Sequence, residues 1–223
     1  MLYIAHCKCT WFPALGSYKS AVGLKQKNPS LKVMLAIGGW NEGGKTYSAM
    51  AKSSESRAKF IESVVAFLEK HSFDGFDLDW EYPGASDRDG GWGDKDNFAN
   101  LVEELSKAFE PHNWLLSAAV SPAKFRVNDG YDVKKIAGYL DFINVMTYDL
   151  HGSWDNAADH HAPLHKRDHD DWDPLTTVIL IGYAEYFIKR TIKRMVAYHT
   201  GTRKEHHFKN YCSEHLSMGD HSL

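Results

Sequence analysis

Residues 73–81 read Phe73-Asp74-Gly75-Phe76-Asp77-Leu78-Asp79-Trp80-Glu81. Polar and apolar side chains alternate in the second half of this stretch, and successive side chains of a β-strand point to opposite faces. The stretch therefore predicts a strand with three carboxylates on one face and three large apolar side chains on the other. The carboxylates belong to Asp77, Asp79 and Glu81.

Carboxylates at every second position of a strand lie about 7 Å apart. Like charges and removal from water raise some of their pKa values, so the row shares protons and holds a protonated carboxyl at neutral pH. That is what a general acid requires. Glu81 is the longest and the last of the three, so we expect it to be the proton donor, with Asp79 between it and the more buried Asp77.

A calcium or magnesium site and an exposed acidic strand are the alternative interpretations of the row. Oxygen ligands for these metals usually come from loops, whereas this row is interleaved with Phe76, Leu78 and Trp80. Catalysis is therefore favoured, and no metal site is predicted here.

The surrounding sequence alternates strand-like with helix-like stretches. Short apolar runs predict strands, and apolar residues at helical spacing predict helices. The expected strands are 31–37, 73–80, 115–120 and 142–147, and the expected helices are 18–27, one capped by Ser53 or Ser54, one starting at Asp94 or Asp96, and 131–140. This alternation predicts βα units and a parallel sheet.

Chemically distinctive residues follow the four predicted strands. These are Gly38-Gly39-Trp40, Asp79-Trp80-Glu81, Ser121-Pro122 and Tyr148-Asp149. Function at the carboxyl ends of several strands is typical of (β/α)8 barrels; a doubly wound open sheet, the competing architecture, would bind a ligand at one switch point. Gly90-Gly91-Trp92-Gly93 follows no predicted strand and does not have the spacing of a phosphate-binding loop.

Composition limits the other classes of function. The chain has 223 residues, 43% of them hydrophobic, which predicts one sizeable packed domain. The net charge of −3 does not favour nucleic acid or an anionic membrane as partner, and no apolar run reaches the roughly 20 residues of a membrane span. Cys7, Cys9 and Cys212 lie near the two ends and predict no disulfide framework.

The pattern changes at both ends of the chain. We expect a divergent segment at 1–16 without a recognisable signal peptide, a catalytic core at 17–177, and a divergent basic tail at 178–223. The tail shows no further strand–turn–helix unit, although 188–198 could form a basic amphipathic helix. His161, His165 and His169 recur every four residues, but Pro163 and neighbouring aspartates favour a solvated loop over a metal site.

Three motifs resemble one known family. Residues 74–81 resemble the DGxDxDWE signature of glycoside hydrolase family 18, the chitinases. Residues 35–40, Leu-Ala-Ile-Gly-Gly-Trp, resemble the family's third-strand motif. Residues 142–149 resemble its sixth-strand MxYD motif, followed by His-Gly-Ser-Trp at 151–154. Order and spacing are most similar to those of secreted animal chitinases.

The resemblance implies a (β/α)8 barrel that hydrolyses β-1,4-linked N-acetylglucosamine polymers with retention, in endo fashion and without a cofactor or metal. The substrate's acetamido carbonyl acts as the nucleophile, which is an exception to the two-carboxylate rule. By position, Glu81 protonates the glycosidic oxygen, Asp79 orients the acetamide, and Asp77 holds the proton balance. Tyr148 bonds the acetamido oxygen.

The resemblance also assigns substrate contacts. Met146 and Asp149 line the same subsite as Tyr148, while Trp40 and Trp154 are stacking platforms on the leaving-group side. Chitin or its oligomers are the expected partner, with no nucleic acid and no membrane. We further expect a monomer and, from the family, an extracellular location.

The chain departs from the family pattern at both ends. Residues 1–5 resemble a remnant of the second barrel strand, the first strand is missing, and strands seven and eight are missing or divergent, so we expect an incomplete barrel from a truncated or mis-spliced reading of a longer gene. No Trp follows residue 172 to form the floor of the central subsite. Two alternatives therefore stand beside hydrolysis: a non-catalytic chitin-binding protein, and an inactive truncated isoform.

Overall fold

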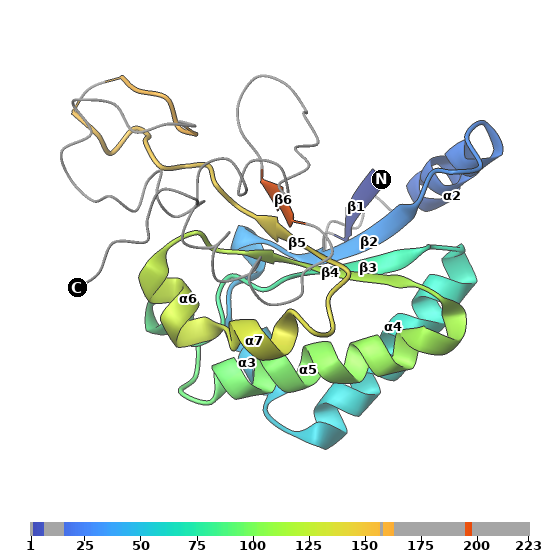
Figure 1. The fold of residues 1–223 in the computed structure, drawn as a ribbon, viewed down its shortest axis with the longest axis horizontal. Coiled ribbons are helices and arrows are strands. Elements are labelled where there is room, and N and C mark those ends of the chain that lie inside the picture. The colour runs from blue at the N-terminus through green and yellow to red at the C-terminus, as the bar shows by residue number, and fades with distance from the viewer. Residues whose placement is uncertain (1, 7–15, 157, 163–194, 198–223) are drawn as a thin grey trace, which may run out of the picture.

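A single parallel sheet organises the chain (Figure 1). The computed structural model describes residues 2–6, 16–156, 158–162 and 195–197. Its six strands are hydrogen-bonded in chain order, and every neighbouring pair is parallel. They are β1 (Leu2–His6), β2 (Val33–Gly38), β3 (Gly75–Asp79), β4 (Leu115–Val120), β5 (Phe142–Val145) and β6 (Met195–Ala197).

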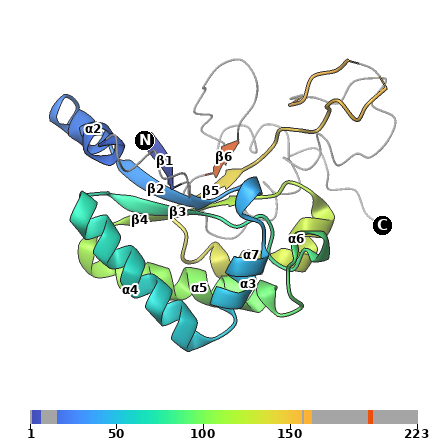
Figure 2. The ribbon, with the colours of Figure 1, turned by 180° about the vertical axis from the view of Figure 1, so that it is seen from behind.

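The helices connect consecutive strands. The α-helices are α2 (Ser17–Gly23), α3 (Lys45–Ala51), α4 (Ser54–His71), α5 (Asp94–Phe109), α6 (Lys124–Gly130) and α7 (Val133–Ile136). Four 3₁₀ turns accompany them: η1 (Leu24–Gln26), η2 (Trp40–Glu42), η3 (Ser86–Arg88) and η4 (Glu110–His112). Helices α3 to α7 lie on the same face of the sheet in both views (Figures 1 and 2).

This arrangement confirms the predicted incomplete barrel. Strands that follow chain order, with the helices on one face, form the wall of a (β/α)8 barrel, whereas a doubly wound sheet carries helices on both faces. Within the described ranges β1 and β6 are the two edges and do not pair with each other. The sheet is therefore an open part of a barrel.

Most of the predicted elements occur close to their expected positions. Ser53 is the N-cap of α4, and its side chain accepts a hydrogen bond from the backbone N–H of Ser56, as expected of a capping serine. Helix α5 begins at Asp94 and buries the predicted apolar face, which consists of Phe98, Leu101, Val102, Leu105 and Phe109. Residues 2–6 form β1, which pairs over its whole length with residues 33–37 of β2.

Two predictions about local structure are wrong, and two helices were missed. The expected helix at 131–140 is reduced to α7, because Tyr131 has an extended backbone that ends α6, and Asp132 caps a new helix of four residues. Helices α3 and α6 were not predicted. Residues 195–197 were expected to belong to a helix in a tail without strands, but they form strand β6 by pairing with the edge of β5. Three residues are too few to show a strand periodicity in the sequence. Residues 188–194 and 198 of the expected helix lie outside the described residues.

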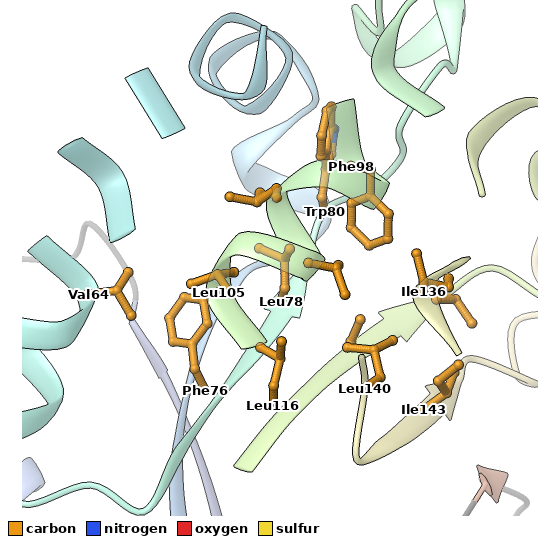
Figure 3. Close-up of a cluster of buried hydrophobic side chains, with 14 of the residues drawn as sticks. Val64, Phe76, Leu78, Trp80, Phe98, Leu105, Leu116, Ile136, Leu140 and Ile143 are labelled. Carbon is orange, nitrogen blue, oxygen red and sulfur yellow. The ribbon is translucent and has the colours of Figure 1, made fainter. Parts of the chain in front are cut away.

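The core lies between the sheet and the helices, and β3 is at its centre (Figure 3). Phe76, Leu78 and Trp80 point into this layer and are at most 1% exposed. The Trp80 ring packs edge-on against Phe98, with ring centroids 5.9 Å apart. The apolar face of β3 therefore anchors the strand, and the carboxylate face is directed away from the helices.

Two features hold β3 in register with β2. At its start, the Asp74 carboxylate accepts hydrogen bonds from the Val33 backbone N–H at 2.9 Å and from Lys25 Nζ at 3.0 Å. At its end, Gly38 pairs with Asp79, and a Cβ atom on Gly38 would lie 1.9 Å from the Asp79 carbonyl oxygen. Gly38 also has a φ of 115°, which a side chain would disfavour. Only glycine therefore allows the two strand ends to approach this closely.

Leu78→Ala should destabilise the fold by about 2–5 kcal/mol, because Leu78 is completely buried and its truncation leaves a cavity. Urea unfolding followed by circular dichroism measures the change. Leu24→Ala is the matched control, since Leu24 is 41% exposed, and it should change stability by less than about 1 kcal/mol. Equal losses in the two variants would contradict the placement of β3 in the core.

Candidate active site

The carboxylates of β3 and of the residues that follow it lie on the face opposite the helices. Asp77 is in the middle of the strand, Asp79 is its last residue, and Glu81 lies two residues beyond it. Asp77 and Glu81 are 6% and 8% exposed, and Asp79 is half-buried. The structure thus brings the three predicted catalytic carboxylates together in the expected order, with Glu81 at the carboxyl end of the sheet.

Asp77 is held by the two neighbouring strands. Its Oδ1 accepts hydrogen bonds from Ser117 Oγ on β4 at 2.5 Å and from Asn144 Nδ2 on β5 at 3.0 Å. Burial raises the pKa of Asp77, and these two hydrogen bonds to the ionised form oppose the rise. Asp77 is therefore fixed in position with a perturbed pKa.

Asp79 has the clearest shift among the three. Burial, followed by the negative charges of Glu81 and Asp77, raises its pKa to about 7. Its Oδ1 is buried and has no hydrogen-bond partner among the residues that the structure describes. A buried carboxylate oxygen without a partner is costly, so this oxygen is suited to meet a polar group of a ligand.

Glu81 lies among groups of both signs. Burial is the main cause that raises its pKa, and the charge of Asp149 adds to the rise. The Tyr82 hydroxyl, the Arg88 guanidinium and the Trp40 backbone N–H oppose it by favouring the carboxylate. The pKa of Tyr82 is itself raised, first by burial and then by the adjacent Glu81, so its hydroxyl remains a donor at neutral pH.

The row as a whole can hold and deliver protons. All three carboxyl groups have raised pKa values, with burial as the first cause in each. Groups that interact this closely titrate as a set, so a proton accepted by Asp79 or Asp77 changes the charge that Glu81 experiences. Chemically, the arrangement suits general acid catalysis at a substrate bound over the carboxyl end of β3.

The aromatic candidates lie on the loops that follow β2 and β5. Trp40, in η2, is 58% exposed, and Arg88 lies over its ring. Tyr148 is 38% exposed, and its effect on the pKa of Tyr82 places it near the Glu81 loop. Trp154 is 65% exposed and folds back over Gly152. Within the described ranges, no hydrogen bond or ring contact joins Trp154 to the carboxylates.

The two remaining candidates differ in burial. Met146 follows β5 and is 7% exposed, with its backbone N–H bonded to the Val120 carbonyl oxygen at 3.0 Å. Asp149 is exposed, has a φ of 54°, and affects Glu81 through its charge. Its backbone N–H donates to His161 Nδ1 at 3.3 Å. Met146 therefore belongs to the wall of the site and Asp149 to its rim.

Several residues around the carboxylates were not predicted from the sequence. Ser117 and Asn144 are polar side chains inside apolar strands, and that exception to the strand pattern could have revealed them. Tyr82 adjoins Glu81 in sequence, with a cis peptide bond between them. Arg88 stands in an acidic, glycine-rich loop, where no sequence pattern indicates a contact with Trp40.

The described ranges contain no cluster of three or more His, Cys, Asp or Glu side chains arranged for a metal ion. Of the three periodic histidines, His161 lies within these ranges, while His165 and His169 lie outside them. In the same ranges, no helix has the length and apolar character to cross a membrane.

The open parallel barrel wall, with its row of carboxylates running to the carboxyl end of β3, defines the class of β/α-barrel enzymes. Comparison with known proteins then identifies the family. The model of the family described as "Glycosyl hydrolases family 18" matches residues 5–205. The chain belongs to this family.

The boundaries of the catalytic core, expected after residue 16 and at residue 177, stay predictions.

Named relatives come from insects and mammals. The endochitinase of Manduca sexta is 50% identical over 157 residues, which are 70% of this chain and 28% of that protein. Chitotriosidase-1 of Mus musculus is 42% identical over 157 residues, covering 67% of this chain and 33% of that protein. The chain thus matches about a third or less of these relatives' length.

Solved structures show the same fold. The Group IV chitinase of Ostrinia furnacalis superimposes with a TM-score of 0.77 at 33% identity, covering 87% of this chain and 57% of that one. Its complex with allosamidin gives a TM-score of 0.75 at 37% identity, with 84% and 52% covered. The sheet described here therefore corresponds to part of a chitinase barrel.

Asp79→Asn should remove a pH dependence of stability. The folded-state pKa of Asp79 is about 7, against an ordinary value of 3.8. Protonated Asp79 therefore contributes to the free energy of unfolding, fully below pH 4. This contribution is lost as the pH rises toward 7. The stability of the parent chain relative to Asp79→Asn should therefore fall across this window and be flat above it.

Urea unfolding between pH 4 and 8 measures the difference. Asp96→Asn makes the same chemical change at an exposed position, and its curve should run parallel to that of the parent chain. If the curve of Asp79→Asn also runs parallel, the raised pKa of Asp79 is contradicted.

Proposed function

We propose that the protein hydrolyses β-1,4 linkages between N-acetylglucosamine units of chitin, in endo fashion, with Glu81 as the acid and with retention of configuration. The observation that carries the proposal is the row of three carboxyl groups with raised pKa values, which ends in the buried Glu81 at the strand's carboxyl end. A carboxyl group with a raised pKa keeps its proton to higher pH than an ordinary glutamate does, and it can transfer that proton to a leaving oxygen.

The named relatives support this substrate class. The Manduca sexta relative is an endochitinase, and the Ostrinia furnacalis Group IV chitinase has been solved in complex with allosamidin. A catalytic domain of the Group II chitinase from the same insect has been solved, as a mutant, with a chain of N-acetylglucosamine units, at a TM-score of 0.76. Chitin oligomers are accordingly the proposed ligand.

The proposed reaction has two steps. First, Glu81 donates its proton to the glycosidic oxygen, the C1–O bond breaks, and the substrate's acetamido oxygen bonds to C1 to give an oxazolinium ion. Second, Glu81, now ionised, accepts a proton from water as the water oxygen attacks C1 and the ring opens. Both displacements occur at C1, so the configuration is retained.

The neighbouring groups support these charge changes. The Oδ1 of Asp79, which has no hydrogen-bond partner among the described residues, is suited to accept the acetamide N–H and to balance the positive oxazolinium. Asp77 lies behind Asp79, fixed by Ser117 and Asn144, and takes part in the proton balance. Tyr148 is proposed to donate a hydrogen bond to the acetamido oxygen, as a phenol can.

The remaining candidates are proposed to bind sugar rings. The exposed indole of Trp40 can cover the apolar face of a pyranose on the leaving-group side, and Trp154 is assigned the same role by its position in the family motif. Met146 and Asp149 line the subsite of Tyr148. The monomeric state and extracellular location remain predictions.

The non-catalytic alternative has less support. A neighbour solved with chitooligosaccharides, YKL-39, has a TM-score of 0.71 at 32% identity, so the fold is compatible with oligomer binding. The complete carboxylate row in this chain nevertheless favours hydrolysis.

Glu81→Gln should lower the turnover of a chitotriose-type chromogenic substrate by a factor of about 10² to 10⁴, because an amide cannot donate the proton of a carboxylic acid. Oligomer affinity should be retained. Glu62→Gln is the matched control, at an exposed position on α4, and should keep full activity. Equal activity of Glu81→Gln and the parent chain would remove Glu81 from the mechanism. Oligomer binding without turnover in the parent chain would support the non-catalytic alternative.

Retention of configuration can be observed directly. Proton NMR of a chitooligosaccharide digest should show the β-anomer as the first product, with the α-anomer appearing only by mutarotation. An α-anomer formed first would exclude the substrate-assisted reaction.

A further inference from the structure

The Arg88 side chain connects two candidate site residues that are far apart in sequence. Its guanidinium carbon lies 3.7 Å from the centroid of the Trp40 ring. The same group donates hydrogen bonds to the Trp40 carbonyl oxygen and, through Nε at 3.3 Å, to the Glu81 carbonyl oxygen. One planar cation therefore contacts the ring and backbone of Trp40 and the backbone of Glu81.

The contact determines how Trp40 can bind. A guanidinium stacked on an indole limits the rotation of the ring and covers one of its faces. Trp40 is nevertheless 58% exposed, so the ring keeps a large surface for a ligand. In addition, the Trp40 backbone N–H supports the Glu81 carboxylate, which makes a second connection between the two residues.

Arg88 is itself held in place by the backbone. Its carbonyl oxygen accepts a hydrogen bond from the Gly44 N–H at 2.9 Å, and its N–H donates to the Ala85 carbonyl oxygen at 2.9 Å. The preceding residue, Asp87, accepts two hydrogen bonds of 2.6 Å from Arg126 of α6. The 3₁₀ turn that presents Arg88 is therefore attached to the segments after both β2 and β4.

We propose that Arg88 is a positioning residue that fixes the Trp40 ring relative to Glu81, so that a sugar stacked on Trp40 presents its glycosidic oxygen to the proton donor. This inference rests on the proposed function and adds to it a residue outside the three motifs. Arg88 acts through Trp40 and Glu81 and has no assigned contact with the substrate.

The charge of Arg88 has a second, separable effect. Four groups influence the pKa of Glu81: the Tyr82 hydroxyl, the Trp40 N–H, Asp149 and Arg88. Asp79 also interacts with Glu81, because the charge of Glu81 raises the pKa of Asp79. Arg88 lowers the pKa of Glu81 against the effect of burial. Without this positive charge, Glu81 should hold its proton to higher pH, which moves the alkaline limb of the kcat/KM profile upward.

Two variants separate position from charge in the full 223-residue chain. Arg88→Lys keeps the positive charge but loses the planar group that stacks and donates to two carbonyl oxygens. Arg88→Met loses both. Lys134→Met is the control, because it removes one charge from an exposed site on α7. Circular dichroism and thermal unfolding select variants that fold like the parent chain.

Calorimetric titration with chitotetraose and carbon NMR titration of the Glu81 carboxyl, assigned with Glu81→Gln, are the primary measurements. Both Arg88 variants should raise Kd, and KM where turnover is measured, about fivefold. Only Arg88→Met should raise the Glu81 titration midpoint. Lys134→Met should change neither.

Failure of the inference is distinguishable from failure of the proposed function. If Glu81→Gln abolishes turnover while Arg88→Lys and Arg88→Met retain the parent's Kd, KM and Glu81 midpoint, the role of Arg88 is wrong and the function stands. If the parent chain binds no chitooligosaccharide, the proposed function fails. The NMR titration still tests the inference in that case: an unchanged titration midpoint of Glu81 in Arg88→Met would contradict the interaction between Arg88 and Glu81.

Discussion

The structure depends on the two-sided character of β3. One face buries Phe76, Leu78 and Trp80 against the helices, each at most 1% exposed, while the other carries the carboxylates. Burial of the apolar face fixes the orientation of the strand, because a shift of one residue would place three carboxyl groups in the core. The same packing that stabilises the sheet therefore aims Asp77, Asp79 and Glu81 away from the helices.

The pKa values of the three carboxyl groups are set by a balance between burial and local hydrogen bonds. Burial raises the pKa of all three, but the groups that oppose this rise differ. Ser117 and Asn144 oppose it at Asp77, and Tyr82 and Arg88 oppose it at Glu81. The buried Oδ1 of Asp79 accepts no hydrogen bond from the described residues. Asp79 consequently has the largest unmet demand for a polar partner. That difference among three similar groups is consistent with the separate roles proposed for them at a substrate acetamide.

The parts of the fold that could be predicted have a periodic or local chemical signal. The strand at 115–120, the cap at Ser53 and the apolar face of α5 agree with the structure because pattern and packing coincide there. Helix α7 is shorter than predicted because a capping aspartate interrupts the apolar pattern, and β6 was missed because only pairing with β5 defines it. The same holds for the candidate site. Its motif residues could be predicted from the sequence, whereas the residues that contact them, such as Ser117, Asn144 and Arg88, could not.

The family, the succession of strands and helices and the row of carboxylates all follow from sequence patterns, because alternation along one strand is a local property of the chain. The residues that surround that row are known from the folded structure alone. Ser117 and Asn144 reach Asp77 from neighbouring strands, and Arg88 reaches back 48 residues to Trp40. Such contacts depend on strand register and loop path, which no local pattern encodes, and they determine the protonation and orientation of the site.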